Sequence, residues 1–120
     1  METAKVLRAA ECDRSEADWG TLTWFASAAL GNSDAMTVGR CTLEPGCANP
    51  MHSHPNCAEV LVVVDGTVAH AVGRDDEVRL EAGDVITIPP NIPHNARNIG
   101  NGDAVLFIAF SAADRRTVGE

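Results

Sequence analysis

Three histidines and one glutamate have the residue types and spacing of a metal site. His52 and His54 are two residues apart, Glu59 follows five residues later, and His94 comes after a proline-rich segment. Three neutral imidazoles and one carboxylate make a good ligand set for a divalent transition metal, and about two positions of a six-coordinate ion would stay open for substrate, water or dioxygen. The alternative is a group of surface or hydrogen-bonded histidines, the usual state of histidines taken singly.

Separate segments of the chain must bring these four side chains together. On an extended strand His52 and His54 project from the same face, because side chains alternate between the two faces. Glu59 lies an odd number of residues from His54, so the intervening segment 55–58, opened by Pro55, must supply a turn or bulge. His94 must arrive from another strand, after the stiff segment 88–93.

The pattern along the chain predicts an all-β sandwich or barrel. From Thr21 onward, short apolar or alternating runs are separated by residues that favour turns. The predicted strands are 21–28, 35–43, 58–64, 67–72, 77–80, 84–89, 94–99 and 104–110. The length of 120 residues fits one domain, with an arm at 1–20, a barrel at 21–112 and an exposed tail at 113–120. The arm is expected to be partly ordered or helical, and Glu2–Ala17 is the best candidate for a helix.

A fifth polar position, His70, is found through a predicted hairpin. Asp65 and Gly66 stand between two apolar runs, a sequence preference of type I′ turns. In such a hairpin Leu61 pairs with His70, and His70 then shares a face with Glu59. Its imidazole could move a proton beside a bound ion. The alternative is a histidine at the edge of the core that is hydrogen-bonded to a carbonyl group.

Two segments resemble the sequence motifs of the cupin superfamily. The segment GCANPMHSHPNCAEVLVVVDG, from Gly46 to Gly66, matches every position of the first motif. The segment GDVITIPPNIPHNARN, from Gly83 to Asn98, matches the second motif except at Asn91, where the pattern has glycine. Asparagine tolerates a left-handed backbone better than most residues, so we expect the turn to be kept.

This resemblance implies a small double-stranded β-helix barrel of the cupin or jelly-roll type. It implies that His52, His54, Glu59 and His94 are metal ligands, and that a homodimer forms. Iron, manganese, nickel, zinc and copper are all compatible with these ligands, and iron is favoured.

Several functions are compatible with such a barrel, because one fold can host many functions. The favoured one is an enzyme that acts on a small oxygenated organic substrate chelated to the metal, with dioxygenase-type chemistry. The redox-neutral alternative is an isomerase, cyclase, lyase or decarboxylase in which the metal is a Lewis acid and His70 is the base. Two further alternatives are a non-catalytic small-molecule binding module and a structural zinc protein that uses Cys47 and Cys57.

Charge and composition argue against other classes of protein. There are 9 lysines and arginines against 17 acidic residues, a net charge of -8, which disfavours binding to nucleic acid or to anionic membranes. No apolar stretch approaches the roughly 20 residues of a transmembrane helix. The charged N-terminal segment shows no secretory signal, so we expect a cytoplasmic protein. The 4 cysteines form no CxxC pair and are expected to be free thiols.

Some side chains near the motifs have open roles. Arg40 and Arg97 could bind a substrate carboxylate or could belong to a solvated face or an ion pair. Trp19, Trp24 and Phe25 form an apolar group, for which core packing or a dimer contact is favoured over lining a ligand site.

Overall fold

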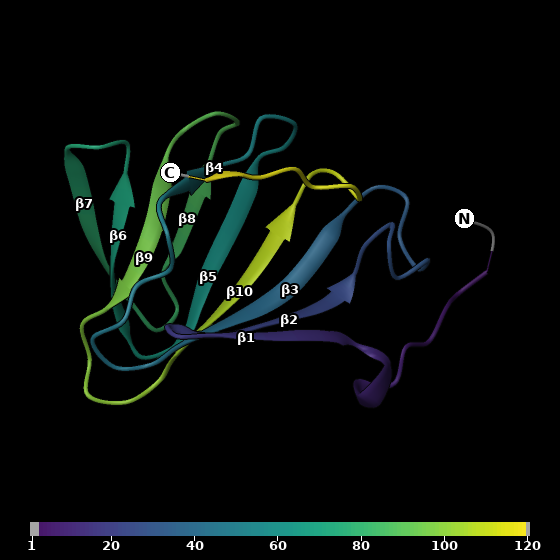
Figure 1. Cartoon of the computed structure of the whole chain (residues 1–120), viewed down its shortest axis with the longest axis horizontal. Coiled ribbons are helices and arrows are strands. Elements are labelled where there is room, and N and C mark those ends of the chain that lie inside the picture. Colours follow the sequence, from purple (N-terminus) through teal and green to yellow (C-terminus); the bar gives the residue numbers. More distant parts are fainter. Residues whose placement is uncertain (1–2, 120) are drawn as a thin grey trace.

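Two antiparallel sheets face each other in the computed structural model, which describes residues 3–119 (Figure 1). A short 3-10 turn, η1, spans Ala9–Glu11. The strands are β1 (Asp13–Ala17), β2 (Gly20–Ala26), β3 (Thr37–Leu43), β4 (His52–Ser53), β5 (Glu59–Asp65), β6 (Thr67–Val72), β7 (Asp76–Glu81), β8 (Val85–Ile88), β9 (His94–Asn98), β10 (Ala104–Phe110) and β11 (Val118–Gly119).

The strand order is that of a jelly-roll barrel. The first sheet has the order β1-β2-β3-β10-β5-β8, and the second has the order β11-β4-β9-β6-β7. Neighbouring strands in both sheets are antiparallel. The expected all-β, double-stranded β-helix fold is therefore confirmed, and a strand is present at each of the eight predicted places.

The predicted hairpin at Asp65 and Gly66 is wrong. β5 pairs with β10 and β8 in one sheet, whereas β6 pairs with β7 and β9 in the other. Gly66, with a φ of 90°, is the corner at which the chain leaves the first sheet and enters the second. A dipeptide that favours a tight turn fits such a corner equally well, because both need a residue that adopts positive φ.

The conclusion drawn from that hairpin nevertheless holds. Glu59, Leu61, Val63, Val68 and His70 are all buried between the two sheets. Side chains alternate along β5 and again along β6, and the inner face of each strand points into the same interior. His70 and Glu59 therefore share the inside of the barrel without being paired across a hairpin.

The N-terminal segment is not helical. The helix predicted for Glu2–Ala17 is wrong over its described part (Glu2 itself lies outside the described residues), which contains η1 and β1. β1 forms a hairpin with β2, in which Ala17 pairs with Gly20, and this hairpin extends the first sheet away from the barrel (Figure 1). The apolar spacing of this segment was too weak to support a helix, and a neighbouring strand gives its backbone groups better partners.

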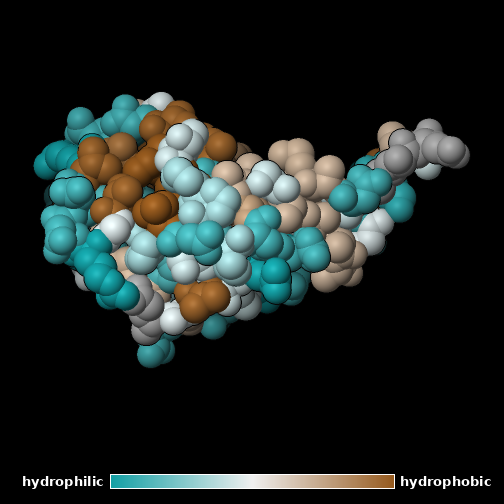
Figure 2. All heavy atoms as spheres, turned by 90° about the horizontal axis from the view of Figure 1, so that it is seen from above, coloured by the Kyte–Doolittle hydropathy of each residue, from teal (hydrophilic) through white to brown (hydrophobic). Residues whose placement is uncertain are grey.

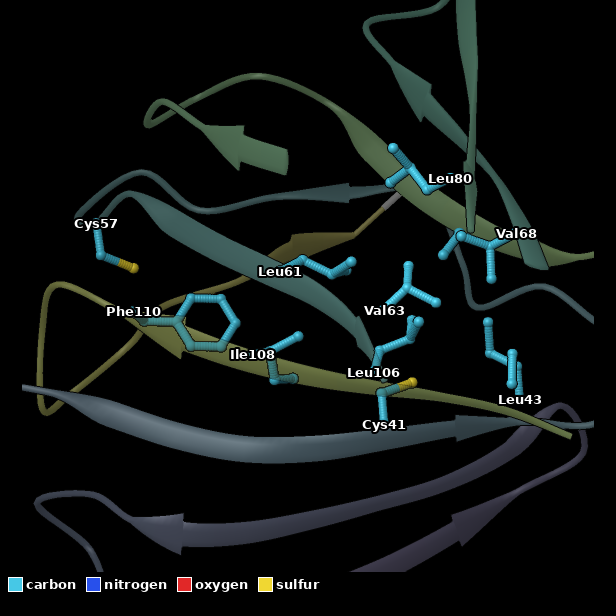
Figure 3. Close-up of a cluster of buried hydrophobic side chains, with 12 residues drawn as sticks. Cys41, Leu43, Cys57, Leu61, Val63, Val68, Leu80, Leu106, Ile108 and Phe110 are labelled. Atoms are coloured by element: carbon cyan, nitrogen blue, oxygen red, sulfur yellow. The ribbon is translucent and has the colours of Figure 1, made fainter. Parts of the chain in front are cut away.

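The hydrophobic core fills the end of the barrel away from the histidines. Leu43, Val63, Val68 and Leu106 are almost completely buried between the sheets, and most of the other core side chains lie along β3, β5 and β10, with Leu80 added from β7 (Figure 3). Residues alternate between inward and outward along β3 and β10, the pattern of strands with one buried face. The packed core supports the strands that carry the polar residues at the other end of the barrel.

The four cysteines are free, as expected. Cys41 and Cys57 are buried in the core, where they act as small apolar side chains. Burial raises the pKa of the Cys41 thiol to about 12, so this thiol stays protonated.

The outer face of the first sheet is apolar. Val60 and Val64 of β5, Val85 of β8 and Phe107 of β10 are exposed. Figure 2 shows the most hydrophobic surface residues gathered at the barrel end of the molecule. The homodimer implied by the family resemblance stays a prediction.

Among residues 3–119, no helix has the length and apolar character needed to cross a membrane.

The corner at Gly66 can be tested by substitution. A Cβ atom at this position would lie 2.9 Å from Ala104 Cα, at a φ that L-residues rarely adopt. We expect Gly66→Ala to lower the free energy of unfolding by about 2–4 kcal/mol, measured by urea denaturation. Gly102→Ala is the control, since its Cβ would meet open space, and we expect it to change stability by less than about 0.5 kcal/mol. Equal stabilities of the two variants would contradict this account of the corner.

Candidate metal centre

The four predicted ligands converge inside the barrel mouth. One donor atom each from His52, His54, Glu59 and His94 can be chosen so that all four lie within 4.8 Å of one another. His52 pairs with His94 across β4 and β9, and their rings are 4.4 Å apart. His54, Glu59 and His94 are buried, whereas His52 is half-buried on the open side. The sequence therefore identified a set of residues that the fold brings together.

The turn predicted between His54 and Glu59 is present. A turn occupies Pro55 and Asn56 and lets β5 begin at Glu59 with its carboxylate facing the imidazoles. The Asn56 side chain donates to the carbonyl of Asp114 and accepts from the amide of Arg116, at 3.1 Å and 2.9 Å. The turn is thereby tied to the segment that follows β10.

The proline-bounded loop before His94 also keeps its predicted geometry. Asn91 has a φ of 70°, so asparagine does occupy the left-handed conformation at the position where the motif has glycine. The Asn91 amide donates to the carbonyl of His54, at 3.0 Å. The motif glycines Gly46 and Gly83 have φ values of 77° and 95°, in agreement with their expected roles in turns.

Backbone carbonyl groups orient all three imidazoles. The Nδ1 atoms of His52, His54 and His94 lie 2.7, 2.9 and 2.8 Å from the carbonyl oxygens of Pro50, Arg116 and Ile92. A carbonyl oxygen can only accept, so each Nδ1 must carry the proton. In a neutral imidazole of this tautomer the lone pair is on Nε2, the atom available to a metal.

These lone pairs meet the carboxylate of Glu59. Nε2 of His94 lies 2.9 Å from Oε1 of Glu59, and Nε2 of His54 lies 3.3 Å from the same oxygen. At such distances the lone pair of each Nε2 atom repels the negatively charged carboxylate oxygen, unless a cation binds to both. A proton can play this part at one imidazole, whereas a divalent ion satisfies the carboxylate and all three imidazoles at once.

The electrostatics of the site favour an ionised glutamate. Burial raises the pKa of Glu59, but the neighbouring His54 and His94 imidazoles outweigh this and lower it to about 2. Burial lowers the pKa of His52, and so do the nearby imidazoles. Burial also opposes protonation of His94, but its contact with Glu59 raises its pKa above the ordinary value. The carboxylate is thus ready to bind a cation across the pH range of cells.

The ligands open onto a cavity of about 290 Å³. Its walls are mainly apolar and include Trp19, Leu22, Trp24, Leu61, Ile108 and Phe110. A volume of this size approaches that of sites for small organic molecules.

His70 is the second polar group inside this cavity. Only 1% of it is exposed, and neither ring nitrogen has a hydrogen-bond partner among the described residues. The backbone of Ala71 lies near the ring and opposes the effect of burial on its pKa, and the alternative of a histidine bonded to a carbonyl stays a prediction. Its ring is stacked on that of His94 at 5.8 Å. Burial, helped by the nearby His94, lowers the pKa of His70 to about 4, so its imidazole is neutral at physiological pH.

Of the aromatic and arginine side chains with open roles in the sequence, only the two tryptophans line the cavity. Trp19 and Trp24 pack against the core as expected, but they also line the cavity, a role that was not favoured. Phe25 packs on Phe107 away from the cavity, beneath Arg40 at 5.4 Å. Arg97 is bound to the exposed Glu77 at 3.0 Å. Neither Arg40 nor Arg97 lines the cavity, so the structure does not support them as ligands of a substrate carboxylate.

Sequence reasoning missed the segment after β10. It was expected only to be exposed, yet it crosses the barrel mouth and ends as β11, paired with β4 (Figure 1). Arg115 and Thr117 line the cavity, and the carbonyl of Arg116 orients His54. No spacing rule links residues so far apart, so the sequence held no signal for this contact.

Comparisons with known proteins agree with this geometry. A family model of the cupin domain matches residues 39–110. The chain belongs to the cupin family.

Relatives and solved structures with different names match this cupin. Germin-like protein subfamily 3 member 3 of Arabidopsis thaliana is 35% identical over 94 residues, covering 74% of this chain and 44% of the relative. An auxin-binding protein of Prunus persica is 34% identical over 85 residues, covering 68% and 41%. A variant of Bacillus subtilis oxalate decarboxylase aligns with a TM-score of 0.84 and 26% identity, covering 94% of this chain and 31% of that one. This cupin therefore spans less than half the length of these proteins.

The burial of His70 predicts a pH dependence of stability in the metal-free protein. Below pH 6.5 the unfolded state takes up a proton on His70, but the folded state does so only near pH 4. Stability must therefore fall as the pH is lowered from 6.5 to about 4, by up to about 3 kcal/mol from this group. His70→Leu should have a smaller slope of unfolding free energy against pH over this range, measured by urea denaturation in the presence of EDTA. An unchanged slope would show that His70 is protonated equally in both states.

Proposed function

We propose that this cupin is a metal-dependent enzyme that acts on a small oxygenated organic substrate. The observation that carries the proposal is the set of three imidazoles, each oriented by a carbonyl group and each within the same four-residue cluster as the Glu59 carboxylate, which the Nε2 atoms of His54 and His94 face directly. A purely structural cluster would not need three identical tautomers directed at one point.

A divalent transition metal fits this donor set. His52, His54, Glu59 and His94 would hold it, and the cavity on the open side of the ligands would receive the substrate. When bound, the ion would supply Lewis acidity and, if redox-active, electron transfer to dioxygen. Iron was favoured from the sequence, and manganese gains support because Bacillus subtilis oxalate decarboxylase, a structural neighbour, has Mn(II) centres.

His70 is the proposed proton-transfer residue. It is buried in the cavity wall, it is neutral, and its nitrogen atoms have no partner among the described residues. A base must keep a free lone pair at working pH, and a pKa of about 4 provides this. Its stacking on His94 keeps the ring beside the ligands.

Two reaction classes follow from this site. Dioxygenase-type chemistry is the first, in line with the expectation from the sequence. Decarboxylation is the second, and the structural similarity to oxalate decarboxylase favours it. In both, the ligands orient the substrate and the apolar walls exclude water, which strengthens electrostatic interactions in the cavity.

Metal binding can be tested with ligand variants. We expect Glu59→Gln and His94→Gln to weaken binding of Mn²⁺ and Fe²⁺ by at least about tenfold, since loss of an outer hydrogen-bond partner alone costs this much. Metal content after dialysis, measured by inductively coupled plasma mass spectrometry, checks this. Cys47→Ser and Cys57→Ser are the controls, because neither sulfur belongs to the cluster. Loss of metal in the cysteine variants would favour the structural zinc alternative.

The reaction class can be tested by assaying the metal-loaded protein. Small hydroxy, keto and dicarboxylic acids are screened with an oxygen electrode and for release of CO₂. Metal-dependent oxygen uptake is the result expected of a dioxygenase, and CO₂ release without net oxygen uptake is that of a decarboxylase. His70→Leu should lower kcat by about 10²–10⁴-fold with little change in metal content. Tight ligand binding without turnover would instead favour the non-catalytic binding module.

A further inference from the structure

Arg115 is the only arginine or lysine among the described residues that line the cavity. It follows β10 in the segment that crosses the barrel mouth (Figure 1). Its guanidinium carbon lies 4.4 Å from the ring centre of Trp24 and 5.1 Å from that of Phe110. Two aromatic faces therefore hold the cation at the edge of an apolar space, in a planar orientation suited to arginine.

Arg115 is not part of a direct ion pair with another described residue, in contrast to three arginines on the surface. Arg14, Arg79 and Arg97 each pair with a glutamate on the surface. None of the ion pairs among the described residues includes Arg115, although the chain carries a net charge of -8. Its recorded hydrogen bond is from Nη1 to the Thr117 hydroxyl, at 2.6 Å. Thr117 occupies only one of the guanidinium donors, so the other donors can bind a further partner.

Leaving this cation half-buried without a carboxylate has a cost. Burial lowers the pKa of Arg115, which reflects the loss of hydration, and the charge of Glu59 offsets part of this loss. An anion that enters the cavity would restore the missing partner.

We propose that Arg115 binds the carboxylate of the substrate and that the substrate is an organic acid with an apolar body. The planar guanidinium can bind a carboxylate through two parallel hydrogen bonds. The aromatic and aliphatic walls receive the body, since each apolar surface removed from water contributes to affinity. A dianion as small as oxalate would leave most of these walls uncovered, so the preferred acid differs from the substrate named for the structural neighbours.

The position of Arg115 connects acid binding to the candidate metal ligands. Thr117 Oγ1, which accepts from Arg115, lies 3.3 Å from Nδ1 of His54. Arg115 and the four candidate ligands line the same cavity, so an acid held by Arg115 would occupy the space next to the ligands. This inference rests on the proposed function for the role of the cavity as a substrate site, but recognition by Arg115 can be measured without metal.

The test compares an acid with its uncharged isostere. The probes are 3-phenylpropionate and 3-phenylpropanamide, titrated into EDTA-treated protein and followed by tryptophan fluorescence, because both tryptophans line the cavity. We expect the wild-type protein to bind the acid at least about tenfold more tightly than the amide, the range of a charged hydrogen bond. Acetate, which has the charge without the body, should bind at least about tenfold more weakly than the phenyl acid.

Variants at Arg115 assign this preference to one side chain. Arg115→Met should reduce the preference for acid over amide to less than about twofold, and Arg115→Lys should retain part of it. Arg79→Met, which removes one positive charge from an exposed position on β7, should leave it unchanged. Circular dichroism confirms folding of each variant, and the lysine variant serves if the methionine variant is unfolded.

The outcomes separate this inference from the proposed function. Equal binding of acid and amide by the wild-type protein, or an acid preference that survives Arg115→Met, overturns the inference. An acid preference that appears only after Mn²⁺ is added also overturns it, because the metal then binds the carboxylate, whereas the proposed function stands. An Arg115-dependent preference in a protein that binds none of Mn²⁺, Fe²⁺, Ni²⁺, Zn²⁺ and Cu²⁺ supports the inference and refutes the metal-dependent function.

Discussion

Three hydrogen bonds from histidine Nδ1 atoms to backbone carbonyl groups determine the character of the site. They fix the tautomer of His52, His54 and His94, and the Nε2 lone pairs of His54 and His94 point towards the Glu59 carboxylate. The carbonyl acceptors belong to the segments just before β4 and β9 and to the segment after β10. Nitrogen lone pairs that face a carboxylate repel it when no cation is present. The fold therefore holds a geometry that becomes favourable only when a positive charge binds between these groups. The favourable free energy of packing the core offsets this local repulsion.

The two ends of the barrel have different roles: the closed end holds the apolar core, and the open end holds the candidate metal site. At the closed end, alternating apolar side chains of β3, β5 and β10 interlock and require no polar partner. At the open end the same strands carry Glu59, Leu61 and Phe110 inward, so one carboxylate lies next to apolar walls. Low polarity there strengthens every charge interaction, including those of Glu59 and Arg115.

Much of this could be predicted from the sequence because the relevant signals are local. Alternation and turn residues located eight strands, the parity of His52, His54 and Glu59 required the turn at Pro55, and the asparagine at position 91 indicated a left-handed turn. The pairing of β5 and β6 could not be predicted, because a residue with positive φ permits a hairpin and a corner between sheets alike. The roles of Trp24, Arg115 and Arg116 were also hidden, since they depend on where a segment without periodicity crosses the barrel mouth.

The carbonyl that orients His54 comes from residue 116, some sixty positions further along the chain. During synthesis the chain emerges from its N-terminus, so β4 and β9 are available to pair before this carbonyl is made. Until then His54 is free to rotate and to exchange tautomers, and the donor set is incomplete. The donor set is therefore complete only when the segment after β10 has crossed the barrel mouth and β11 has paired with β4.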